Sequence, residues 1–231
     1  MAPHGDSLPS TPDQFPASDK FDAIVEVKVG PALDRSFFLH KGIVTFYSGY
    51  FRAAVNGNFA EAGKGIIKLP TEDAGTFGRF VDWIYHRRLD FDALEGGPVF
   101  LAMCHLWVLA DTRNIPMLAN AMITAIRDQI VKEWIMPTNV LPYVYENSGD
   151  SAMIRRFLIR MIANTGSQVS CMTAESRVRW PEEALWDLSS ALWALKDNSI
   201  TKNMSKTDIA TMDVCEYHDH QDGVKCTKHA A

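Results

Sequence analysis

The 231-residue sequence has few cysteines and no long apolar run. Its cysteines, Cys104, Cys171, Cys215 and Cys226, are too few and too widely spaced for the disulfide scaffold of a small secreted domain. The first twenty residues contain four prolines and lack the apolar stretch of a signal peptide. The longest strongly apolar run, residues 98–110, is shorter than the roughly 20 residues that a membrane span needs. We therefore expect a protein of the cytoplasm or the nucleus, with reduced thiols and no membrane contact.

Positive charge is also scarce. Lys and Arg total 23 against 28 Asp and Glu, so the formal net charge is -5. Nucleic-acid binding needs concentrated positive charge to displace the counterions of the phosphates, so we expect no direct nucleic-acid partner. The sequence also has no Walker-type phosphate loop, no G-x-S-x-G elbow and no H-E-x-x-H helix. These absences predict that the protein is not an enzyme.

The apolar residues that are present, 47% of the chain, first follow the period of strands. Valines alternate with charged residues over 23–29, a Gly-Pro turn follows, and a second strand is expected over 36–39. A third short strand is expected over 65–69, where a proline ends it. This pattern predicts a small sheet that contains one hairpin.

The remaining apolar residues mostly follow the period of helices. Two short helices are expected over 41–56, and a longer one after Asp73, which we expect to be its N-cap. Pro98 and Pro116 each open a further helix, the second of which has an apolar row that Trp134 would extend. Beyond residue 137 only helices are expected, including one from Pro181 that carries Leu185, Leu188, Leu192 and Leu195. The fold class is therefore α+β, with a small mixed sheet covered by helices and an all-helical C-terminal extension.

We divide the chain into four parts. Residues 1–20 are expected to be a disordered leader, because they contain too little apolar surface to offset the entropy of ordering. Residues 21–133 form the sheet-containing domain, residues 134–200 the helical extension, and residues 201–231 a polar tail.

The tail contains a group of residues that zinc prefers as ligands. Cys215, His218, His220 and Cys226 lie within twelve residues, and two thiolates with two imidazoles can close a tetrahedral site. The spacing matches no standard zinc finger. The alternative is a polar tail in which these residues occur together by chance. A structural zinc ion is the one cofactor that the sequence suggests.

Several segments, taken in order, resemble the BTB/POZ domain. They are Phe21-Asp22 before the valine-rich strand, Phe38-Leu39-His40-Lys41, Tyr47-Ser48-Gly49-Tyr50-Phe51, Asn58-Phe59-Ala60-Glu61, Ile66-Ile67-Lys68-Leu69-Pro70, residues 77–85 and residues 106–111. The resemblance covers roughly residues 20–130. The whole chain is similar to the short single-BTB proteins that are abundant in filamentous fungi, including its helical part around 143–147 and 154–156 and its Cys/His tail.

The resemblance implies a protein-interaction module that forms homodimers. In the family, an acidic residue before the first strand and a basic residue of a His-Lys pair form a charged pocket near the dimer interface. The matching residues are Asp22 and Lys41. The alternative is that Asp22 is a solvated charge at a strand end and Lys41 a residue at a helix start.

The resemblance also suggests a cullin as partner. Many BTB proteins are substrate adaptors of cullin-RING ubiquitin ligases and contact the cullin through a hydrophobic-x-Glu element, which Phe59 and Glu61 match. The alternative is that Phe59 folds back onto the core. The sequence has neither Kelch repeats nor a MATH domain to bind a substrate. Two other hypotheses are a transcription- or chromatin-associated BTB scaffold and a soluble relative of potassium-channel tetramerisation domains.

Overall fold

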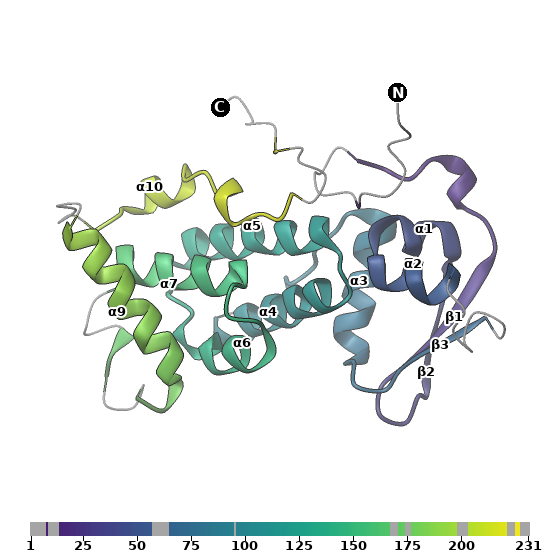
Figure 1. The fold of residues 1–231 in the computed structure, drawn as a ribbon, viewed down its shortest axis with the longest axis horizontal. Coiled ribbons are helices and arrows are strands. Elements are labelled where there is room, and N and C mark those ends of the chain that lie inside the picture. Colours follow the sequence, from purple (N-terminus) through teal and green to yellow (C-terminus); the bar gives the residue numbers. More distant parts are fainter. Residues whose placement is uncertain are drawn as a thin grey trace. The chain divides into compact units, whose positions relative to one another are not determined.

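The computed structural model describes residues 8, 14–56, 65–94, 96–166, 171–173, 177–197, 203–220 and 225–226. The chain divides into two compact units. Figure 1 labels the helices and strands along the chain. The first comprises residues 1–90, 109–120 and 219–231, and the second comprises residues 91–108 and 121–218. We call them the sheet unit and the helical unit. Their limits differ from the boundary expected after residue 133, because helices α4 (Gly97–Thr112) and α5 (Pro116–Glu133) contribute residues to both.

The sheet unit contains a three-stranded mixed sheet in the order β2-β1-β3. Strand β1 (Ile24–Val29) pairs antiparallel with β2 (Arg35–His40) and parallel with β3 (Ile66–Leu69). Val25, Val27 and Val29 of β1 are fully or almost fully buried, as expected for the apolar side of an alternating strand. The hairpin and the third strand predicted from the sequence are confirmed.

Three helices cover this sheet, namely α1 (Lys41–Tyr47), α2 (Gly49–Asn56) and α3 (Ala74–His86). Asp73 is the predicted N-cap of α3, since its carboxylate accepts a hydrogen bond of 2.7 Å from the Thr76 amide. The interior of the unit is rich in aromatic side chains. Those that are buried include Tyr47, Phe51, Phe77, Phe80 and Trp83.

Residues before Phe21 are held against this aromatic core by Arg87. Its guanidinium lies 5.0 Å from the ring centroid of Phe15 and 4.6 Å from that of Trp83, and it donates a hydrogen bond of 2.7 Å to the Gln14 carbonyl. A 3-10 turn, η1 (Ser18–Lys20), follows. Order therefore begins before Phe21, which composition could not indicate, because the stabilising partner is more than seventy residues away. Residues 1–7 and 9–13 of the expected leader lie outside the described residues.

The helical unit is built around α6 (Leu141–Asn147), α7 (Met153–Thr165) and α9 (Glu182–Asp197), with the short helix α10 (Lys206–Ala210) in the tail. Helices α7 and α9 pack against each other. The 3-10 turns are η2 (Thr138–Val140), η3 (Arg177–Arg179) and η4 (Cys215–Tyr217). Among the described residues, none of the helices combines the length and apolar character that a membrane span requires.

One expectation for the helical part is wrong, and two further observations add to what the sequence pattern indicates. Trp134 does not extend α5, because it adopts the left-handed conformation (φ 57°) just after the helix and is 43% exposed. Leu185 and Leu192 are 43% and 48% exposed, since α9 buries the face that carries Ala184, Leu188 and Leu195 instead. The tail is more than a polar segment. It contains α10, and three of its apolar residues are buried, namely Ile209, Val214 and Tyr217.

Candidate functional site

The outer face of the hairpin exposes apolar side chains. Alternation along β1 and β2 turns Val25, Val27 and Leu39 inward and leaves Ile24 and Phe38 on the opposite face. Phe38 is 67% exposed and Ile24 is 47% exposed. The register pairs Ile24 with His40 and Glu26 with Phe38, so Ile24 and Phe38 are diagonal neighbours on one face.

Phe21 extends this surface. Its ring lies edge-on to the His40 ring at 5.3 Å, and the residue is 57% exposed. His40 is in turn fixed by Tyr85, whose hydroxyl accepts a hydrogen bond of 2.9 Å from the His40 amide. We call Phe21, Ile24 and Phe38 the outer apolar face. Three large apolar side chains in one exposed patch are typical of an interaction surface.

Asp22 and Lys41 directly follow Phe21 and His40, whose rings are in contact. The Asp22 carboxylate accepts a hydrogen bond of 2.8 Å from the Gly42 amide, so it caps the first turn of α1. Gly42 is required there, since a Cβ atom would lie 2.6 Å from the Lys20 carbonyl oxygen. Within the described residues no ion pair joins Asp22 to Lys41. The structure therefore gives Asp22 a local capping role, and the charged dimer pocket stays a prediction.

The expected cullin-contact residues Phe59 and Glu61 lie outside the described residues.

The Cys/His group of the tail comes together in space. The ligand atoms of Cys215, His218, His220 and Cys226 all lie within 4.8 Å of one another, and all four residues are half-buried. The Cys226 Sγ atom is 3.8 Å from His220 Nε2. Bonds of about 2.0–2.3 Å to a tetrahedral zinc ion place ligand atoms roughly 3.3–3.8 Å apart, so small side-chain rotations suffice for binding. The cluster can therefore hold a metal ion, and its donor set suits zinc.

Residues of α5 hold the backbone between these ligands. The Asn120 side chain is 5% exposed and pairs with the Asp219 backbone twice, accepting from its amide at 2.8 Å and donating to its carbonyl at 2.9 Å. The Thr124 hydroxyl lies 3.3 Å from His218 Nε2, a contact of the kind that orients metal-binding imidazoles.

Tyr217 anchors the same segment through a contact with α7. It is 4% exposed, and its ring packs edge-on against Phe157 at 5.4 Å. Burial raises the pKa of its phenol to about 12. The sequence indicated the four candidate ligands but not Asn120 and Thr124, because their contacts join residues more than ninety positions apart. It did not indicate the buried Tyr217 either.

Comparison with protein families matches residues 13–115 to the model of the BTB/POZ domain. The matched range contains the whole three-stranded sheet and the outer apolar face. Comparison with curated proteins gave no match.

Proposed function

We propose that the BTB/POZ domain of residues 13–115 pairs with a second copy of the chain through the outer apolar face, so that the protein is a homodimeric interaction module. The family mediates protein–protein interaction, which is a binding function and not a catalytic one. The observation that carries the proposal is the exposure of Phe38 (67%) beside Phe21 (57%). Burying such a side chain contributes roughly 1–2 kcal/mol, and two-fold symmetry counts each contact twice.

The charged pocket expected at Asp22 and Lys41 belongs to this proposal. Asp22 directly follows Phe21, and Lys41 directly follows His40, whose ring contacts Phe21. Both charges therefore lie beside the surface that the dimer would bury, where their pairing would gain strength from the exclusion of water.

Light scattering after gel filtration tests the dimer. Phe38→Glu places a charge in the outer apolar face and is expected to convert the dimer to a monomer. Ile135→Glu is the matched control, because Ile135 is also a large exposed apolar residue (45%) but belongs to the helical unit. If both variants form dimers of equal stability, the outer apolar face is not the dimer interface. A tetramer would favour the potassium-channel-type hypothesis.

Within this module, we propose a substrate-adaptor role in a cullin-RING ubiquitin ligase. It rests on the match of Phe59 and Glu61 to the hydrophobic-x-Glu pattern. Pull-down of a cullin by the full chain, lost in Phe59→Ala/Glu61→Arg, would support it. Equal capture by both forms would contradict these contact residues. If no cullin is captured while DNA-associated proteins are, the transcription- or chromatin-associated scaffold is the better hypothesis.

We further propose that the Cys/His cluster binds structural zinc. Two thiolates and two imidazoles lie within 4.8 Å of one another, and the segment that carries them is anchored by Asn120 and Tyr217. Metal analysis of protein purified without a histidine tag is expected to find about one equivalent of zinc. The variant Cys215→Ser/Cys226→Ser should lose it, whereas His86→Ser, at an exposed position elsewhere, should retain it. A wild-type protein with negligible zinc after growth in zinc-supplemented medium would contradict the proposal.

A further inference from the structure

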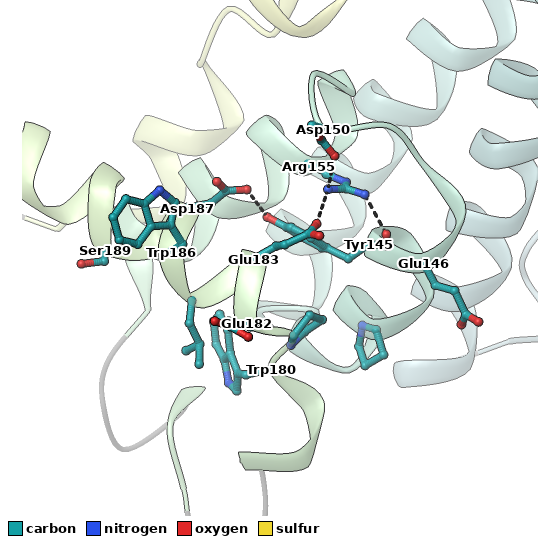
Figure 2. Close-up of a pocket in the computed structure, with 13 residues that line it drawn as sticks. Tyr145, Glu146, Asp150, Arg155, Trp180, Glu182, Glu183, Trp186, Asp187 and Ser189 are labelled. Carbon is teal, nitrogen blue, oxygen red and sulfur yellow. Dashed lines mark hydrogen bonds and ion pairs between the residues drawn. The ribbon is translucent and has the colours of Figure 1, made fainter.

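The helical unit contains a groove of about 1100 Å³ beside the first half of α9 (Figure 2). Its other walls come from α6, from the start of α7 and from the segment that precedes α9. The charged residues among its lining are Glu146, Asp150, Arg155, Glu182, Glu183 and Asp187.

The groove is strongly acidic. Among the described residues that line it there are five carboxylates and one guanidinium, so this lining has a formal net charge of -4. The net charge of the whole chain is -5, so the net charge of this one surface is nearly as large. Such a concentration focuses the electrostatic field and attracts cationic groups.

The cation among the described lining residues, Arg155, is paired within the protein itself. Arg155 is 4% exposed, and Figure 2 shows it between Asp150 and Glu183. It donates to the Glu183 carboxylate at 2.8 Å and to the Tyr145 carbonyl at 2.7 Å. Asp187 accepts a hydrogen bond of 2.7 Å from the Tyr145 hydroxyl. These contacts fix the floor of the groove.

Two other carboxylates of the groove, those of Glu146 and Glu182, do not pair with Arg155 or Tyr145. Glu146 and Glu182 are exposed, and within the described residues neither forms an ion pair. Their charges are therefore presented to solvent, where a cationic ligand can meet them.

The groove also offers apolar surface. Trp186 is 72% exposed and Leu185 is 43% exposed, both on α9. An exposed indole face binds Lys and Arg side chains by cation–π attraction. The same helix provides an example, since the Lys196 ammonium lies 4.5 Å from the ring centroid of Trp193.

We propose that this groove binds a basic peptide segment of a partner protein, in which Lys or Arg residues flank an apolar side chain. Glu146 and Glu182 would pair with the cationic groups, and Trp186 and Leu185 would contact the apolar side chain and the Lys or Arg stems. The sign of the charge excludes phosphate-bearing ligands such as nucleic acids. The proposal goes beyond self-association, because all lining residues belong to the helical unit. If the protein proved not to dimerise, the proposal of peptide binding would be unaffected.

Selection of random peptides on the full-length protein tests the proposal. A phage-displayed dodecapeptide library is selected on the wild type and on Glu146→Lys/Glu182→Lys, and the enriched peptides are sequenced. We expect the wild type to enrich peptides with Lys or Arg around an apolar residue and the double variant to lose them. Enrichment of neutral or acidic peptides, no enrichment at all, or the same basic peptides on both proteins would overturn the proposal.

Fluorescence anisotropy with the most enriched peptide then measures each contribution. Trp186→Ala and Glu146→Lys/Glu182→Lys should each weaken binding about tenfold or more. The matched controls are Trp193→Ala, an exposed tryptophan of α9 outside the groove, and Asp128→Lys/Asp197→Lys, two exposed acidic residues elsewhere. Controls that weaken binding as much as the groove variants would overturn it. Circular dichroism verifies that each variant is folded.

Discussion

Replacing Arg155 with methionine removes a buried charge from the floor of the groove while keeping most of the side-chain volume. The Arg155 guanidinium donates to the carbonyls of Tyr145 and Ser148 and to the Ser148 hydroxyl, and it lies 4.4 Å from the Tyr145 ring centroid. It thereby joins the end of α6 to α7, and through Glu183 it joins α7 to α9.

The magnitude follows from what the variant leaves unpaired. A buried carbonyl without a partner costs about 1–3 kcal/mol. The Tyr145 carbonyl is buried and the Ser148 carbonyl is partly buried, so both lose a hydrogen bond that water replaces at most in part. The Glu183 side chain is 66% exposed and can return to water, so its ion pair contributes about 1 kcal/mol or less. We expect Arg155→Met to lower the free energy of unfolding of the helical unit by about 3 kcal/mol, which corresponds to a Tm lower by roughly 10 °C.

Urea and thermal unfolding, followed by circular dichroism, measure this difference. Arg156→Met is the matched control, because Arg156 is an exposed neighbour on the same helix and contacts the Met153 sulfur at 3.5 Å. The control should stay within about 0.5 kcal/mol of the wild type. If Arg155→Met is no more destabilising than Arg156→Met, the reasoning about this network is refuted.

Three further predictions concern the Asp73 cap, the buried Tyr145 and the metal. Asp73→Ala should lower the free energy of unfolding by about 1 kcal/mol in urea, against little change for the exposed Asp82→Ala; equal effects would argue against the cap. Burial raises the pKa of Tyr145, and its hydrogen bond to Asp187 raises it further, so its contribution is intact below about pH 10 and is lost as the pH rises above that value. The free energy of unfolding should therefore fall less steeply between about pH 10 and 11 in Tyr145→Phe than in the wild type, and equal slopes would contradict this. A chelator should lower the Tm of the wild type by several degrees and leave that of Cys215→Ser/Cys226→Ser unchanged, whereas equal responses would speak against a structural metal.

Local sequence patterns predicted the sheet and most helices correctly. Alternation in β1 identified the hairpin, and Asp73 identified the start of α3, because both signals depend on neighbouring residues. The apolar pattern of α9 did not decide which face of the helix is buried. Leu185 and Leu192 follow helical spacing as well as the buried residues do, and only packing against α7 decides which face is covered.

The parts that the sequence did not reveal depend on contacts between distant residues. Arg87 orders the segment around Gln14, and Asn120 fixes the backbone at Asp219, although no local pattern connects these positions. The groove was missed for the same reason, since its carboxylates come from α6, α9 and the loop between α6 and α7. The sequence indicates it only by Trp186, which stands close to the acidic residues Glu182, Glu183 and Asp187.

The mass of the wild-type protein in solution tests the central claim most directly. Light scattering at a concentration of about 50 µM should give twice the chain mass of 25.9 kDa, with the mass falling to that of one chain in Phe38→Glu. A wild-type protein that has the mass of a single chain at this concentration would contradict the homodimer.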